Sequence, residues 1–94
     1  MSHIIEHARQ RIKKRIGTKD AEKIFEEALL HGVKFSDTKG NLKRFLSAGA
    51  IKHLSDAIVY KGFVFWHRRT VLITVTPLPQ RYVKYIKPKK NLAP

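Results

Sequence analysis

Near the start of the chain, one histidine and two arginines recur at every fourth position. His7, Arg11 and Arg15 stand at i, i+4 and i+8 in the segment HARQRIKKR. Side chains four residues apart lie on one face of a helix, so these three would form a basic ridge. An imidazole can move a proton, and two guanidiniums can hold negative charge, so the ridge suits a phosphodiester. The alternative interpretation is a solvated basic face.

The overall charge points to acidic partners. Lysine and arginine contribute 20 residues against 7 aspartates and glutamates, which gives a net charge of +13 with neutral histidines. Such an excess favours nucleic acid, an acidic protein or an anionic membrane surface. No stretch is long and apolar enough to span a bilayer, and the first residues lack a signal-peptide pattern. We therefore expect a cytoplasmic protein with no membrane partner.

Several kinds of chemistry are disfavoured by composition. The chain has no cysteine, which excludes disulfides, thiol catalysis and cysteine-type zinc sites. His3 and His7 share helical spacing, but no carboxylate accompanies them in a ligand-like pattern, so we expect no metal and no cofactor. The few acidic residues offer no suggestive partner for a serine-type triad.

Metal-independent cleavage of RNA fits the composition better. RNA supplies its own nucleophile, the 2′-hydroxyl. The protein need only move two protons and stabilise charge on the phosphate, which histidine, lysine, arginine, tyrosine and threonine can do. His7 is the candidate general base or acid.

Helical spacing dominates the first half of the chain. The first helix should end at Gly17 and bury a stripe that the basic ridge borders. Thr18 is the expected cap of a second helix, with Asp20 and Glu22 in its first turn. A third, weaker helix follows, in which Gly49 is unfavourable. The apolar positions are Ile5, Ala8, Ile12 and Ile16, then Ala21, Ile24, Phe25, Ala28 and Leu29, and finally Leu42, Phe45, Leu46 and Leu54.

From residue 57 the period changes to that of strands. AIVY and FVFWH flank Lys61-Gly62, a hairpin pattern, and TVLITVT follows after a turn at Arg68-Arg69. Alternation in this last strand places one set of residues on each face. The sets are Val71, Ile73 and Val75 against Thr70, Leu72, Thr74 and Thr76.

The order of these elements predicts an α+β fold. N-terminal helices should pack on one face of a three- to four-stranded antiparallel sheet. Residues 1–86 form a single domain, with a short helix or strand near 82–86, and residues 87–94 form a basic flexible tail.

Three segments in order carry a resemblance to a known group. HARQRIKKR, TKGNLKR and VYKGFVFWHRRTVLITVTPLP resemble small phage and mobile-element proteins of the barnase–EndoU–colicin–RelE-like ribonuclease superfamily. The resemblance covers roughly residues 7–79. It implies a RelE- or colicin D-like arrangement and a metal-free active site. Carried over, it implicates His7, Arg11, Lys39 and Thr74 in catalysis, with Arg15 beside them and Tyr60 as a weaker candidate.

Other basic residues extend the expected nucleic-acid surface. These are Lys43, Arg44, Arg68, Arg69, Arg81 and Lys84. Together with Arg15 they would bind the RNA backbone.

The leading hypothesis is a small, toxin-like, metal-independent endoribonuclease, a hydrolase acting on cytoplasmic RNA. Its candidate partners are RNA and a neutralising or host protein. One alternative is a phage protein that binds nucleic acid without cleaving it. The other is an inhibitor or regulator that docks on an acidic host protein or a ribonucleoprotein.

Overall fold

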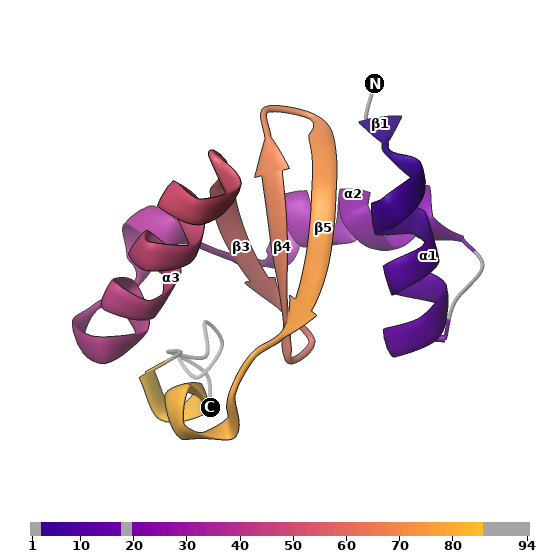
Figure 1. The fold of residues 1–94 in the computed structure, drawn as a ribbon. Helices are drawn as coiled ribbons and strands as arrows, with labels where there is room; N and C mark the ends of the chain where they lie inside the picture. Colours follow the sequence, from indigo (N-terminus) through magenta and orange to yellow (C-terminus); the bar gives the residue numbers. More distant parts are fainter. Residues whose placement is uncertain (1–2, 18–19, 86–94) are drawn as a thin grey trace.

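The structure, a computed structural model, describes residues 3–17 and 20–85 (Figure 1). Its helices are α1 (Glu6–Arg15), α2 (Ala21–His31) and α3 (Gly40–His53), with short 3-10 helices η1 (Phe35–Asp37) and η2 (Gln80–Tyr85). Its strands are β1 (His3–Ile4), β2 (Val33–Lys34), β3 (Asp56–Tyr60), β4 (Phe63–Arg68) and β5 (Val71–Pro77). The expected tail, residues 87–94, and the expected cap Thr18 lie outside the described residues.

The strands form one sheet in the order β1-β5-β4-β3-β2. Strands β2 to β5 pair antiparallel, and the two-residue β1 adds a parallel pair to β5. The α+β class and the antiparallel sheet predicted from the sequence are therefore confirmed. The parallel edge strand was not predicted, because two residues are too few to show a strand period.

The hairpin between β3 and β4 follows the predicted turn. Lys61 and Gly62 have φ values of 52° and 82°. Positive φ at both central residues is typical of a type I′ turn, whose twist matches that of the flanking strands. The second turn contains Arg69 at φ 53°, which confirms the predicted reversal near that residue.

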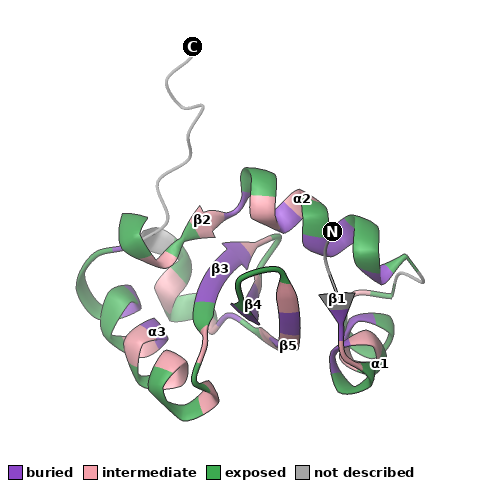
Figure 2. Cartoon of the chain, turned by 90° about the horizontal axis from the view of Figure 1, so that it is seen from above, coloured by how far each residue is buried: buried purple, intermediate pink, exposed green. Residues whose placement is uncertain are grey.

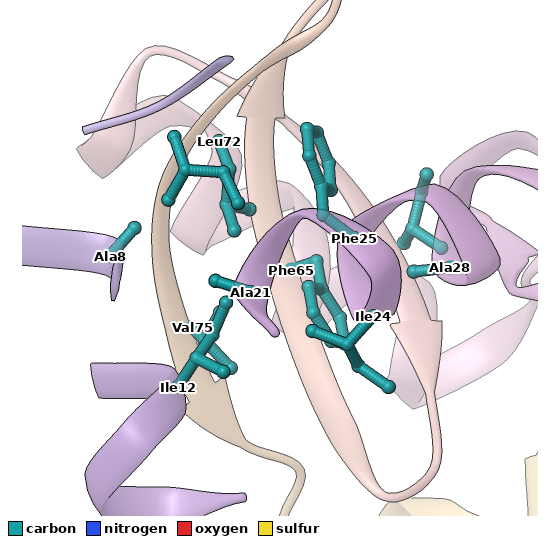
Figure 3. Packing of buried hydrophobic residues seen from close by; sticks show 11 residues of the cluster. Ala8, Ile12, Ala21, Ile24, Phe25, Ala28, Phe65, Leu72 and Val75 are labelled. Atoms are coloured by element: carbon teal, nitrogen blue, oxygen red, sulfur yellow. The ribbon is translucent and has the colours of Figure 1, made fainter. Parts of the chain in front are cut away.

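One face of the sheet packs against α2. Phe25 and Phe65 are fully buried there, together with Ala8 and Ile12 of α1 (Figure 3). The predicted stripes of α1 and α2 are confirmed, with Ala21, Ile24 and Ala28 also buried. At the start of α2 the cap is Asp20, whose carboxylate accepts from the backbone N–H of Lys23 at 3.1 Å. The prediction that Asp20 lies inside the first turn was wrong. Asp20 precedes the helix as its N-cap, because its carboxylate accepts from a backbone N–H of the first turn that has no partner within the helix.

The other face packs against α3. Leu42 and Leu46 of α3 are buried against Val64 and Trp66 of β4. Figure 2 shows α2 along one side of the sheet and α3 toward the other. The prediction that the helices cover one face only was wrong. Four consecutive residues of β4, from Val64 to His67, are buried, and a strand buried on both faces needs a cover on each.

An irregularity in β5 changes which residues share a face. Trp66 pairs with Thr74 and His67 with Leu72, so Ile73 is an extra residue between two successive pairs. A bulge of this kind breaks the period of two. Leu72 consequently joins Val75 in the cluster under α2. The prediction that Leu72 shares a face with Thr74 and Thr76 was wrong for this reason.

Candidate functional site

Helix α1 lies along the β5 side of the sheet. It has a buried apolar stripe and, beside it, the basic ridge of His7, Arg11 and Arg15. Ala8 and Ile12 are fully buried under α2. Arg9 donates to both carboxylate oxygens of Glu22, at 3.2 and 2.7 Å, which ties α1 to α2. This bond, and the charge of Glu22, raise the pKa of Arg9. Because one residue step turns a helix by about 100°, the basic ridge emerges beside the buried stripe.

The basic ridge forms one wall of an open cleft. The cleft has a volume of about 330 Å³ and lies between α1 and the end of α3, with β5 along its length. In Figure 1, β5 stands between α3 and α1 in front of α2. The residues that line it are Ile5, His7, Arg11, Arg15, His53, Ile73, Thr74, Val75 and Thr76. Four of the residues expected at the site, His7, Arg11, Arg15 and Thr74, are thus brought together.

Within the ridge, Arg11 contacts His7. The Nε–H of Arg11 donates to Nε2 of His7 at 3.4 Å. A neutral imidazole that accepts at Nε2 carries its proton on Nδ1. This long hydrogen bond is weak, so His7 can give up this acceptor role at little cost.

Two hydroxyl groups come from β5. Thr74 is 7% exposed, and Thr76 follows two residues later on the same face. Thr76 accepts a hydrogen bond from the indole N–H of Trp66 at 2.9 Å. Because its oxygen is the acceptor in that bond, Thr76 keeps its own O–H as a donor.

The opposite wall contributes His53, which the sequence reasoning missed. His53 is the last residue of α3, is half-buried, and has its ring 5.0 Å from that of Trp66 at 42°. Burial lowers the pKa of His53, and the charge of Lys52 adds to this effect. The only signal in the sequence was the spacing of His53 four residues after Gly49, which puts both on one helix face. Thr76 was also missed, although it alternates with Thr74.

Taken together, the lining has a uniform electrostatic character. Among the residues that the structure describes, it contains two guanidiniums, two imidazoles and two hydroxyls, and no carboxylate. Such a set donates hydrogen bonds and positive charge, and it accepts protons only through its imidazoles. It is chemically suited to an anion.

Lys39 does not line this cleft. It caps the start of α3, whereas His53 ends the helix. Fourteen helical residues at 1.5 Å each separate the two positions by about 20 Å. The structure therefore does not bring Lys39 to Thr74.

The other expected basic residues lie elsewhere. Lys43 and Arg44 line a separate hollow of about 590 Å³ beside Phe35. The ammonium nitrogen of Lys43 lies over the Phe35 ring, 5.6 Å from its centroid. Arg68 donates to the backbone oxygen of Leu54 at 2.7 Å.

Two more arginines and two further residues complete the expected set. Arg69 is exposed in the β4–β5 turn, and Arg81 lies 5.1 Å from the ring of Tyr82. Tyr60 donates to a carboxylate oxygen of Glu27 at 3.0 Å, on the α2 face and away from the cleft; burial and this bond raise its pKa. The side chain of Lys84 lies outside the described part of the chain.

Comparisons with protein-family models, with curated proteins and with solved structures find no match to this chain. Over residues 3–17 and 20–85, no helix has the length and apolar character to cross a bilayer. Within the same ranges, no three histidine, aspartate or glutamate side chains group closely enough to hold a metal ion. The structure is thus a small α+β fold with a cleft lined by basic and hydroxyl side chains.

Proposed function

We propose that this protein is a small, metal-independent endoribonuclease of cytoplasmic RNA, and that the cleft between α1 and α3 holds the phosphodiester to be cleaved. One observation carries the proposal: His7, Arg11, Arg15 and Thr74 line one cleft, to which the described parts of the chain contribute no carboxylate. Functional groups from residue 7 to residue 74 meet there although the chain separates them widely.

Binding of a phosphate is favoured by the cleft's unbalanced charge. Arg11 and Arg15 lie four residues apart, where like charges repel by a few tenths of a kcal/mol. A phosphate accepts paired N–H bonds from guanidinium and relieves that repulsion. A volume of about 330 Å³ is at the small end of ligand sites, which span about 300–1,000 Å³. The cleft therefore suits a short length of single strand.

The proposed reaction uses the 2′-hydroxyl of the bound RNA as nucleophile. One group takes its proton as the oxygen attacks phosphorus, and another gives a proton to the leaving 5′-oxygen. His7 is one of these groups. Arg11 and Arg15 hold the non-bridging oxygens, and Thr74 donates a hydrogen bond to the charge that develops on them. The resemblance to the barnase–EndoU–colicin–RelE-like ribonucleases supports the same reading.

The test is RNA cleavage in the presence of a chelator. The parent protein, His7→Ala and the control His31→Ala, an exposed histidine at the end of α2, are incubated with a labelled single-stranded RNA. We expect cleavage by the parent and the control and a loss of about 10²- to 10⁴-fold in His7→Ala. Equal rates for His7→Ala and the parent would refute the role of His7.

A binding assay separates the alternatives. Parallel titrations use RNA and an all-deoxy strand of the same sequence over a range of salt concentrations. Salt-dependent binding without cleavage would identify a nucleic-acid-binding protein instead, and each arginine removed should lower the log–log slope by about 0.7. Binding to an acidic protein but not to RNA would identify the docking alternative.

A further inference from the structure

His53 faces the same cleft as His7 but comes from the other side of it. His7 lies on α1 and His53 at the end of α3, and β5 with Thr74 lies between these helices (Figure 1). Attack on phosphorus is in line with the leaving oxygen, so the proton acceptor and the proton donor must stand on opposite sides of the phosphate. Two imidazoles on opposite walls satisfy this requirement.

The fold holds the His53 ring in a defined place. Its ring packs on Trp66 at 5.0 Å, and the indole N–H of Trp66 is fixed by Thr76 at 2.9 Å. One turn earlier in α3, Gly49 lets the helix approach the indole, since a Cβ at Gly49 would lie 2.2 Å from the Trp66 ring. Catalytic groups need such support, because a misplacement of about 1 Å can cost 10²-fold in rate.

The surroundings of His53 favour its neutral form. Burial lowers its pKa, and the charge of Lys52 adds to this effect. The other charged or titratable groups near the ring are Arg11, Arg15 and His7 across the cleft and Arg68, which binds the carbonyl of the next residue, Leu54. Thr74 and Thr76 of β5 are uncharged. Burial is the first cause of the lowered pKa, and the C-terminal end of α3 acts in the opposite sense by favouring the cation. His7, by contrast, is exposed to water on α1.

We propose that His53 is the general base and His7 the general acid of this site, an inference that rests on the proposed function. The neutral His53 ring takes the proton of the 2′-hydroxyl while the 2′-oxygen forms its bond to phosphorus. The bond from phosphorus to the 5′-oxygen breaks, and the His7 imidazolium gives its proton to that oxygen. The products are a 2′,3′-cyclic phosphate and a free 5′-hydroxyl, and no water, metal or oxidant is consumed.

The test uses two substrates that differ in one atom. Each is a DNA strand with a single ribonucleotide linkage, and in the second the 5′-bridging oxygen of that linkage is replaced by sulfur. A thiolate leaves without being protonated, so this substrate needs a base but no acid. The proteins are the parent, His7→Ala, His53→Ala and His53→Phe, the last of which retains a ring against Trp66, with His31→Ala as the control.

On the oxygen substrate, we expect each variant at His7 or His53 to lose about 10²- to 10⁴-fold in rate. On the sulfur substrate, His7→Ala should return to within roughly tenfold of the parent, while both His53 variants stay slow. Thermal melts identify any variant that fails to fold, and His53→Phe then stands in for His53→Ala.

Other outcomes distinguish the role of His53 from the proposed function. Cleavage by the parent and by His53→Phe at equal rates overturns the role of His53 and leaves the proposed function standing. Recovery of the His53 variants on the sulfur substrate, with or without His7→Ala, overturns the assignment of base and acid. A parent that cleaves neither substrate overturns both the inference and the proposed function.

Discussion

Gly49 is the residue at which the structure reverses the expectation from helix propensity. In the interior of a helix, alanine is more favourable than glycine by about 0.8–1.0 kcal/mol. On that basis, Gly49→Ala should stabilise the protein. In the structure, however, a Cβ at position 49 would lie 2.2, 2.8 and 2.9 Å from three carbons of the Trp66 ring.

The clash should outweigh the gain in propensity. Trp66 is 2% exposed and its N–H is bonded to Thr76, so the ring cannot swing away as a flexible side chain would. Inserting a methyl group into such a site costs about 1–3 kcal/mol. After subtraction of the propensity gain of about 1 kcal/mol, we expect Gly49→Ala to lower the free energy of unfolding by up to about 2 kcal/mol.

The measurement is urea unfolding followed by indole fluorescence, since the chain has a single tryptophan. Ala48→Gly is the matched control, because Ala48 is exposed on the same helix and reports the Ala–Gly difference without a clash. We expect both substitutions to destabilise, and Gly49→Ala also to change the emission of the folded state. A rise in stability of about 1 kcal/mol in Gly49→Ala, mirroring the loss in Ala48→Gly, would refute the close approach of α3 to Trp66.

Three further predictions concern the core, the cleft and pH. Ile12→Ala, at a fully buried position of α1, should lower the free energy of unfolding by about 2–5 kcal/mol, measured by urea denaturation; a loss below 1 kcal/mol would argue against this packing. Arg15→Ala should lower kcat/KM on RNA by about 10- to 100-fold, which corresponds to the loss of a hydrogen bond to a charged group. Lys39 lies outside the cleft, so Lys39→Ala should change kcat/KM less than threefold. A larger loss in Lys39→Ala than in Arg15→Ala would point to a different site. The pKa of His53 is lowered in the folded state, so below about pH 6.5 the unfolded chain binds more protons than the folded chain. Acidification should therefore lower the free energy of unfolding of the parent more than that of His53→Phe. Equal changes of this free energy between pH 7 and pH 5 in the two proteins would contradict this.

The parts of the fold that the sequence predicts are those set by local rules. The buried stripe of α1, with Ala8 and Ile12, follows from helical spacing alone. The hairpin follows from Lys61-Gly62, because glycine readily adopts the positive φ that its turn requires. These rules act over a few residues, so they can be applied to the sequence without knowledge of tertiary contacts.

The bulge at Ile73 lies beyond such rules. An extra residue in one strand is defined only by the pairing of that strand with its neighbour, here Trp66 with Thr74 and His67 with Leu72. Alternation assigns Leu72 to the face of Thr74, and only the pairing corrects it. The consequence reaches the cleft, because the bulge lets Leu72 and Val75 pack under α2 while Thr74 and Thr76 face the opposite side.

His53 shows why part of the candidate site could not be predicted from the sequence. The basic ridge is contiguous on one helix, so its chemistry is visible in the spacing of His7, Arg11 and Arg15. His53 acquires a role only through Trp66, which positions its ring, and through Gly49, which lets α3 approach that indole. By helix propensity alone, Gly49 destabilises α3. In the structure, the missing side chain of Gly49 allows α3 to pack closely against Trp66 of the sheet. The position that propensity disfavours is therefore the one on which the geometry of the proposed acid–base pair depends, and Gly49→Ala should reduce cleavage in proportion to how far it displaces His53.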